Sequence, residues 1–78
     1  MTMEEYQELF EDRLAEAKYF LQEAIRLGSK ELEKCANEAI TACNGAIKNA
    51  RLNDAEAYHN DLMSFLWECS ELREEIEE

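Results

Sequence analysis

Residues that interrupt helices are almost absent from this chain: its 78 residues contain no proline and only two glycines, Gly28 and Gly45. Alanine, glutamate and leucine are abundant, and all three favour helices. No stretch alternates polar and apolar residues as a half-buried strand would. The sequence therefore predicts an all-α fold, and its length predicts a single domain over residues 1–78.

Capping signals mark the first two helices. Thr2 and Glu5 match the capping box, in which each side chain accepts a hydrogen bond from the backbone N–H of the other residue. A helix over residues 3–27 would end at Gly28, which readily adopts the left-handed conformation, and Ser29 would cap the next helix at once. Such a short link forces the two helices into an antiparallel hairpin.

The second turn is predicted at residues 52–54, after a helix over about 30–51 and before a third over about 55–76. Asn53 tolerates the left-handed conformation, and Asp54 is a good N-cap. Because the three segments have similar lengths, an antiparallel three-helix bundle is expected.

Each predicted helix carries an apolar stripe at helical spacing. The first stripe comprises Met3, Tyr6, Phe10, Leu14, Ala17, Leu21, Ala24 and Ile25. The second, made mostly of small residues, comprises Leu32, Cys35, Ala36, Ala39, Ile40, Cys43, Ala46, Ile47 and Ala50. The third comprises Ala55, Tyr58, Leu62, Phe65, Cys69, Leu72 and Ile76. Its members alternate by three and four residues, which predicts a single coiled-coil seam along the whole third helix.

Cys35, Cys43 and Cys69 lie on these stripes, where cysteine behaves as a small hydrophobic residue. Their number is odd, and their spacing matches neither a disulfide framework nor a zinc site. The N-terminal residues are acidic and lack the features of signal and transit peptides. We therefore expect free, structural thiols in a reduced, cytoplasmic protein.

Signatures of catalysis are missing from the sequence. His59 is the only histidine, so neither a di-iron bundle site nor a nucleophile with its base and orienting group has the residues it needs. Calcium-binding loops and glycine-rich phosphate loops do not occur. The sequence predicts a binding protein rather than an enzyme, with no metal and no cofactor.

Charge limits the choice of partner. Nineteen acids against eight bases give a net charge of -11. Phosphates repel this charge, so it disfavours direct binding to nucleic acid or an anionic membrane and favours a basic protein. The acids are concentrated toward the C-terminus, where residues 52–78 hold nine acids and one base. The alternative is that the charge only keeps a small protein soluble.

Two acidic surfaces are candidates for binding a basic partner. On the third helix, Asp54, Asp61, Glu68 and Glu75 recur every seven residues and so share one edge, with Glu71 close by. On the first helix another face is shared by Glu5, Glu8, Asp12, Glu16 and Glu23. A solvated face without a partner is the alternative for both.

Apolar residues outside the stripes suggest an anchor for the same partner. Tyr19 is predicted opposite the stripe of the first helix, and Met63, Leu66 and Trp67 are predicted on one outer face of the third. Exposed tryptophan and methionine flanked by acids are typical of a binding interface. The alternatives are an isolated surface tryptophan and a homodimer formed through the third helix.

In size, acidity and helical content the chain resembles small inhibitors made by phages and mobile elements, such as anti-CRISPR proteins and other DNA mimics. The acidic edge Asp54, Asp61, Glu68 and Glu75 carries this likeness, which is one of overall character across the chain. It implies a protein that occupies a basic, nucleic-acid-binding surface of a partner inside a bacterial cell. The alternative is a homodimeric helical interaction or scaffold module.

Overall fold

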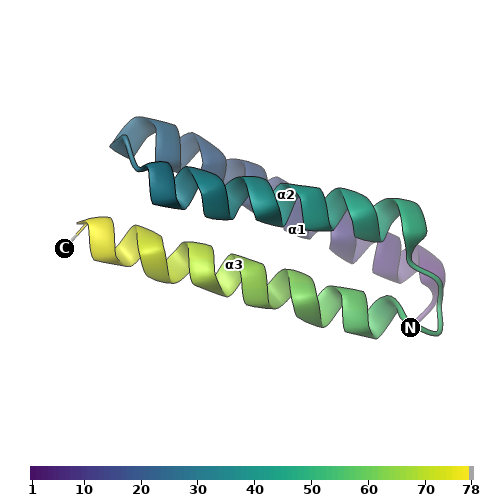
Figure 1. Cartoon of the computed structure of the whole chain (residues 1–78). Coiled ribbons are helices and arrows are strands. Elements are labelled where there is room, and N and C mark those ends of the chain that lie inside the picture. The colour runs from purple at the N-terminus through teal and green to yellow at the C-terminus, as the bar shows by residue number, and fades with distance from the viewer. Residues whose placement is uncertain (78) are drawn as a thin grey trace.

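The computed structural model describes residues 1–77 and consists of three helices (Figure 1). α1 spans Met3–Leu27, α2 spans Lys30–Asn49 and α3 spans Ala55–Glu77. Each helix packs against both of the others, in an elongated body measuring 39 × 16 × 15 Å. The predicted all-α antiparallel three-helix bundle is confirmed.

The first turn is built as the sequence predicts. Thr2 and Glu5 form the capping box, with the Thr2 N–H donating to Glu5 Oε1 at 3.0 Å and the Glu5 N–H donating to Thr2 Oγ1 at 3.2 Å. Gly28 ends α1 in the left-handed conformation, at φ 68°. Ser29 caps α2 by accepting the Leu32 N–H at 3.1 Å.

The second turn differs from the prediction. α2 ends at Asn49, because Ala50 is already extended. No residue other than glycine among 1–77 has a positive φ, so the left-handed role predicted for Asn53 is wrong. Asp54 precedes α3 as expected, but its side chain turns back and accepts the Arg51 N–H at 2.7 Å. The Asp54 N–H donates in turn to the Arg51 carbonyl at 3.0 Å, which closes the turn without a left-handed residue.

The core lies between the three helices. Its largest fully buried side chains are Phe10, Leu32, Cys43, Leu62 and Cys69. Alanines on α2, including Ala36, Ala39 and Ala46, are buried as well and let the neighbouring helices approach closely. The predicted stripe on α2 is confirmed.

Two residues of the predicted stripes are exposed. Ile25 is 68% exposed, because Ala24 occupies the core position beside it and the chain reverses at Gly28 before anything can cover it. Ile76, near the end of α3, is 39% exposed. Stripe residues near the Gly28 turn and near the end of α3 are therefore exposed, because no neighbouring helix covers them there.

Six of the seven residues of the stripe predicted for α3 pack into or against the core, all but Ile76, but the buried face is wider than a single seam. α3 packs against both α1 and α2, so it buries a wider face than a two-stranded coiled coil would. Leu66, which the sequence placed on the outer face, is only 5% exposed and belongs to the core together with Leu62 and Cys69. Half-buried Phe65 packs against the same core and lines a hollow next to α2.

Candidate functional site

A groove between α1 and α3 brings together several residues that sequence analysis singled out. Tyr19 from α1 and Met63, Leu66 and Trp67 from α3 line it, although they are far apart along the chain. Ala15, Glu16, Phe20 and Ser70 complete the lining of this space of about 600 Å³. We call this surface the Trp67 groove.

Three of the apolar residues that line the groove are largely exposed to solvent. Trp67 is 65% exposed, Tyr19 is 48% exposed and Met63 is 43% exposed. Leu66 forms the buried floor beneath them, which corrects the prediction that it is a surface residue. The groove therefore exposes an apolar surface with space beside it, which makes it a candidate binding site.

Contacts with neighbouring side chains order the rim of the groove. The Tyr19 ring packs edge-on against Phe20, with centroids 5.6 Å apart, and the Arg73 guanidinium carbon lies 5.7 Å from the Tyr19 centroid. Arg13 donates from Nη1 to Met63 Sδ at 3.4 Å. Sequence analysis placed Tyr19 on the surface, but only the packing shows that it lies next to α3.

A network of ion pairs joins α1 to the C-terminal part of α3 beside the groove. Glu23 accepts hydrogen bonds from Arg26 at 2.8 Å and from Arg73 at 2.9 Å. Both guanidiniums also contact Glu77, at 3.0 and 3.4 Å. Hydrogen bonds from Arg26 and Arg73 lower the pKa of Glu23 to about 2. Glu23 is therefore charged and occupied within the fold, and cannot also face a partner freely.

The acidic edge of α3 stays open to solvent. Asp61, Glu68 and Glu75 are exposed, as is Glu71 nearby, and none of these four pairs with a base among residues 1–77. Asp61 and Glu68 line one shallow hollow together with Ser64 and Phe65. Asp54 is set apart from this edge, because its carboxylate is engaged by the backbone of the second turn.

The acidic face predicted on α1 is partly used by the structure itself. Glu5 is held in the capping box, and its hydrogen bonds with Thr2 lower its pKa. Glu16 pairs with Arg13 at 3.3 Å, and Glu23 belongs to the ion-pair network. Asp12 remains exposed and without an ion pair among the described residues. On α1 the charge open to a partner is therefore smaller than the sequence suggests.

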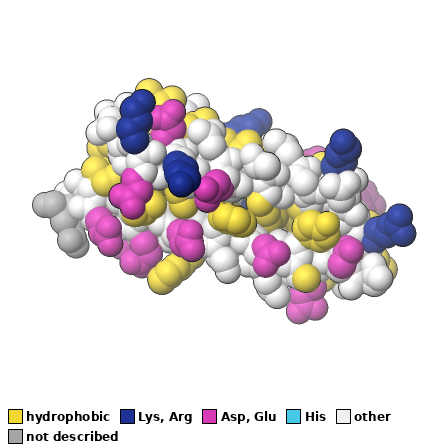
Figure 2. All heavy atoms as spheres, viewed as in Figure 1, with side chains coloured by type: hydrophobic (Ala, Val, Ile, Leu, Met, Phe, Trp, Pro, Cys, Tyr) yellow, Lys and Arg dark blue, Asp and Glu magenta, His cyan; other side chains and the backbone are white. Residues whose placement is uncertain are grey.

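Charge is divided between the faces of the bundle. α3 holds seven acids and a single arginine, Arg73, whereas α2 holds three acids and three lysines. Figure 2 shows acidic side chains gathered along the part of the surface formed by α3, with lysine and arginine mostly elsewhere. Among residues 1–77 no charged side chain is buried.

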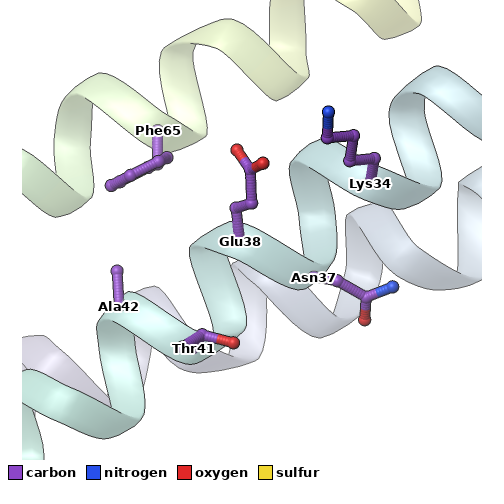
Figure 3. A pocket seen from close by; sticks show the side chains of 6 residues that line it. All are labelled: Lys34, Asn37, Glu38, Thr41, Ala42 and Phe65. Atoms are coloured by element: carbon purple, nitrogen blue, oxygen red, sulfur yellow. The ribbon is translucent and has the colours of Figure 1, made fainter.

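A second hollow, which sequence analysis missed, lies between α2 and α3 (Figure 3). Phe65 extends from α3 toward Ala42 and Glu38 of α2, and Lys34, Asn37 and Thr41 complete the lining of about 520 Å³. Glu38 and Lys34 give this hollow both signs of charge. Phe65 was assigned wholly to the core, and no local signal shows that its ring is only half covered.

Within residues 1–77, histidine, cysteine and acidic side chains do not gather into a group of three or more that could hold a metal ion. His59 lies within α3 and is half-buried. No helix in this range is apolar over enough of its length to cross a membrane.

No known protein family, curated protein or solved structure matches the chain.

Proposed function

We propose that the chain is a non-enzymatic protein inhibitor that uses its acidic α3 side to occupy a basic, nucleic-acid-binding surface of a partner. This is the activity of a phage or mobile-element antagonist acting in the cytoplasm of a bacterial host. The observation that supports it is the uneven division of charge: seven acids against one base on α3, beside an electrically balanced α2.

The net charge density of α3 is somewhat more than half that of a nucleic acid strand. Seven carboxylates and Arg73 on a helix of 23 residues, about 35 Å long, give a net of roughly one negative charge per 6 Å. One strand of duplex DNA carries one charge per roughly 3.4 Å along its axis. A basic groove that binds phosphates would therefore attract α3, with a weaker field than that of DNA.

The Trp67 groove would supply the short-range part of the affinity. Complementary charges mainly accelerate encounter and exclude wrong partners, whereas buried aromatic anchors contribute most of the binding energy. Trp67 and Met63 lie on the flank of α3 next to α1, whereas Asp61 and Glu68 lie on the flank next to α2. A partner that used both would have to wrap around the exposed side of α3. The partner that fits is a basic protein surface with an apolar side chain positioned to enter the groove.

Competition with DNA tests this proposal. The immobilised chain would be exposed to a bacterial extract at low salt, and bound proteins would be eluted with a short duplex DNA and identified by mass spectrometry. We expect the eluted protein to bind DNA on its own and to be released by the chain from that DNA. Binding that duplex DNA leaves unaffected would contradict the proposal.

Charge reversals separate specific mimicry from general acidity. Asp61→Lys with Glu68→Lys should slow association with the eluted protein and weaken its salt dependence. Glu31→Lys with Glu33→Lys makes the same change in net charge on α2 and should have a much smaller effect. Equal effects of the two pairs would show that net charge alone matters.

A homodimer formed through the Trp67 groove is the alternative that a specific observation favours, since three apolar residues there are exposed. A dimer held by apolar contacts would be strengthened or unchanged by salt, because salt screens the repulsion between two acidic chains. A complex with a basic partner would weaken instead. Light scattering of the wild type and of Trp67→Ala at low and high salt distinguishes these outcomes.

A further inference from the structure

Two cysteines from different helices meet in the core. Cys35 of α2 and Cys69 of α3 have their Sγ atoms 3.1 Å apart, with the Cys69 thiol donating a hydrogen bond to Cys35 Sγ. Cys69 is fully buried, whereas Cys35 remains 7% exposed. A disulfide bond measures about 2.05 Å, so bond formation requires the two sulfurs to approach by only about 1 Å. The third cysteine, Cys43, lies eight residues beyond Cys35, about 12 Å further along α2.

We propose that Cys35 and Cys69 form a thiol–disulfide exchange site that takes small-molecule disulfides as its substrates and closes to an internal disulfide linking α2 to α3. This inference is independent of the proposed inhibitor function. Both cysteines are free thiols in the structure, which is the reduced state of the pair.

The exchange proceeds in two balanced steps. The Cys35 thiol loses its proton and attacks one sulfur of the disulfide RSSR, forming a mixed disulfide and releasing the first thiolate, which takes up a proton as RSH. Cys69 then loses its proton and attacks Cys35 Sγ, releasing the second thiolate as RSH. In sum, two protein thiols are oxidised to one disulfide, and one RSSR is reduced to two RSH.

The order of attack follows from position. Cys35 is the more accessible of the two, and its thiolate would keep the hydrogen bond that Cys69 donates. Cys69 lies deeper, at the distance required of a resolving thiol. Burial raises the pKa of both thiols, and the nearby carboxylates of Glu38 and Glu68 add to the increase. Because the thiolate is the reactive form, attack in the closed bundle should be slow.

Charge selects among the possible disulfides. A chain with net charge -11 repels anionic reagents and attracts cationic ones. The dication cystamine should therefore react faster than neutral hydroxyethyl disulfide, which should react faster than anionic oxidised glutathione. The differences should shrink at high salt, whereas the identity of the linked cysteines should not change.

The test treats the fully reduced, folded protein with each of these three disulfides. Free thiols counted in denaturant after an acid quench should fall from three to one per chain. Proteolysis after Glu38 separates Cys35 from Cys43 and should yield a single cross-link, between Cys35 and Cys69. The closed ring spans about 35 residues, so the melting temperature should rise by about 10 °C or more and return on reduction.

Variants keep the outcome interpretable. Cys43→Ala removes the uninvolved thiol and should still form the cross-link. Cys69→Ala should stop at a mixed disulfide on Cys35. Mass spectrometry would detect it as the addition of one RS group from the reagent in place of the thiol hydrogen. Three thiols remaining after treatment, a cross-link that contains Cys43, or a disulfide between two chains would each overturn the proposal. A denatured wild-type control, which should give mixed pairings, shows what the fold itself selects.

Discussion

Leu66 and Trp67 are neighbours on α3, yet the structure assigns them opposite roles. Leu66 is 5% exposed in the core, whereas Trp67 is 65% exposed at the rim of the groove. Replacing each by alanine in turn tests this assignment, since both positions lie within the same helix and both variants gain helix propensity. We expect the smaller side chain to cause the larger loss of stability.

The magnitudes follow from burial. Leu66→Ala removes three buried carbon groups at about 0.8 kcal/mol each, and the cavity left behind adds to the loss, so about 3 kcal/mol is expected. Only about a third of the Trp67 surface is buried. Trp67→Ala should therefore reduce the unfolding free energy by about 1 kcal/mol. A domain of 78 residues has a total stability of about 4–12 kcal/mol, so the loss at Leu66 would be a large fraction.

Urea unfolding followed by circular dichroism at the helix band measures both variants and does not depend on tryptophan fluorescence. The midpoint should fall strongly for Leu66→Ala and slightly for Trp67→Ala, with similar slopes for all three proteins. Equal losses, or a larger loss for Trp67→Ala, would mean that α3 is rotated about its axis. The Trp67 groove would then not exist as described.

Three further predictions concern the turns and the charges. Gly45→Ala should stabilise by about 0.5–1 kcal/mol, because an added Cβ meets no atom within 4 Å in the helix interior, whereas Gly28→Ala should destabilise by about 1 kcal/mol because φ is +68° there; thermal unfolding of both variants provides the comparison. The pKa of Glu23 is about 2 in the folded state, so Glu23 contributes stability that is present above pH 4.5 and is lost as the pH falls from 4.5 to 2. The melting temperature of Glu23→Gln should therefore fall less than that of the wild type over this pH range. Asp61→Lys with Glu68→Lys should raise the melting temperature by a few degrees at low salt by relieving repulsion, and a gain that persists at high salt would show another cause.

The helices and most of their ends follow from residues close together in the chain. The capping box at Thr2, the left-handed Gly28 and the Ser29 cap depend on hydrogen bonds that span only a few residues, so the sequence alone was enough to predict them. The second turn was mispredicted because α2 ends two residues earlier than expected and the turn closes through Arg51 and Asp54 without a left-handed residue. The acidic character of α3 was equally readable, since it requires only composition and helical spacing.

The candidate site depends on contacts between distant segments. Tyr19 meets Arg73, Glu23 pairs with Arg73 and Cys35 meets Cys69 across separations that no local pattern encodes. Leu66 looked like a surface residue because a single seam was assumed, and only a third helix packed on both neighbours shows that it is core. Sequence periodicity determines which face of a helix is apolar, but the width of the face that is buried depends on how many helices pack against it. That number is a property of the bundle, and so is the groove in which Trp67 stands.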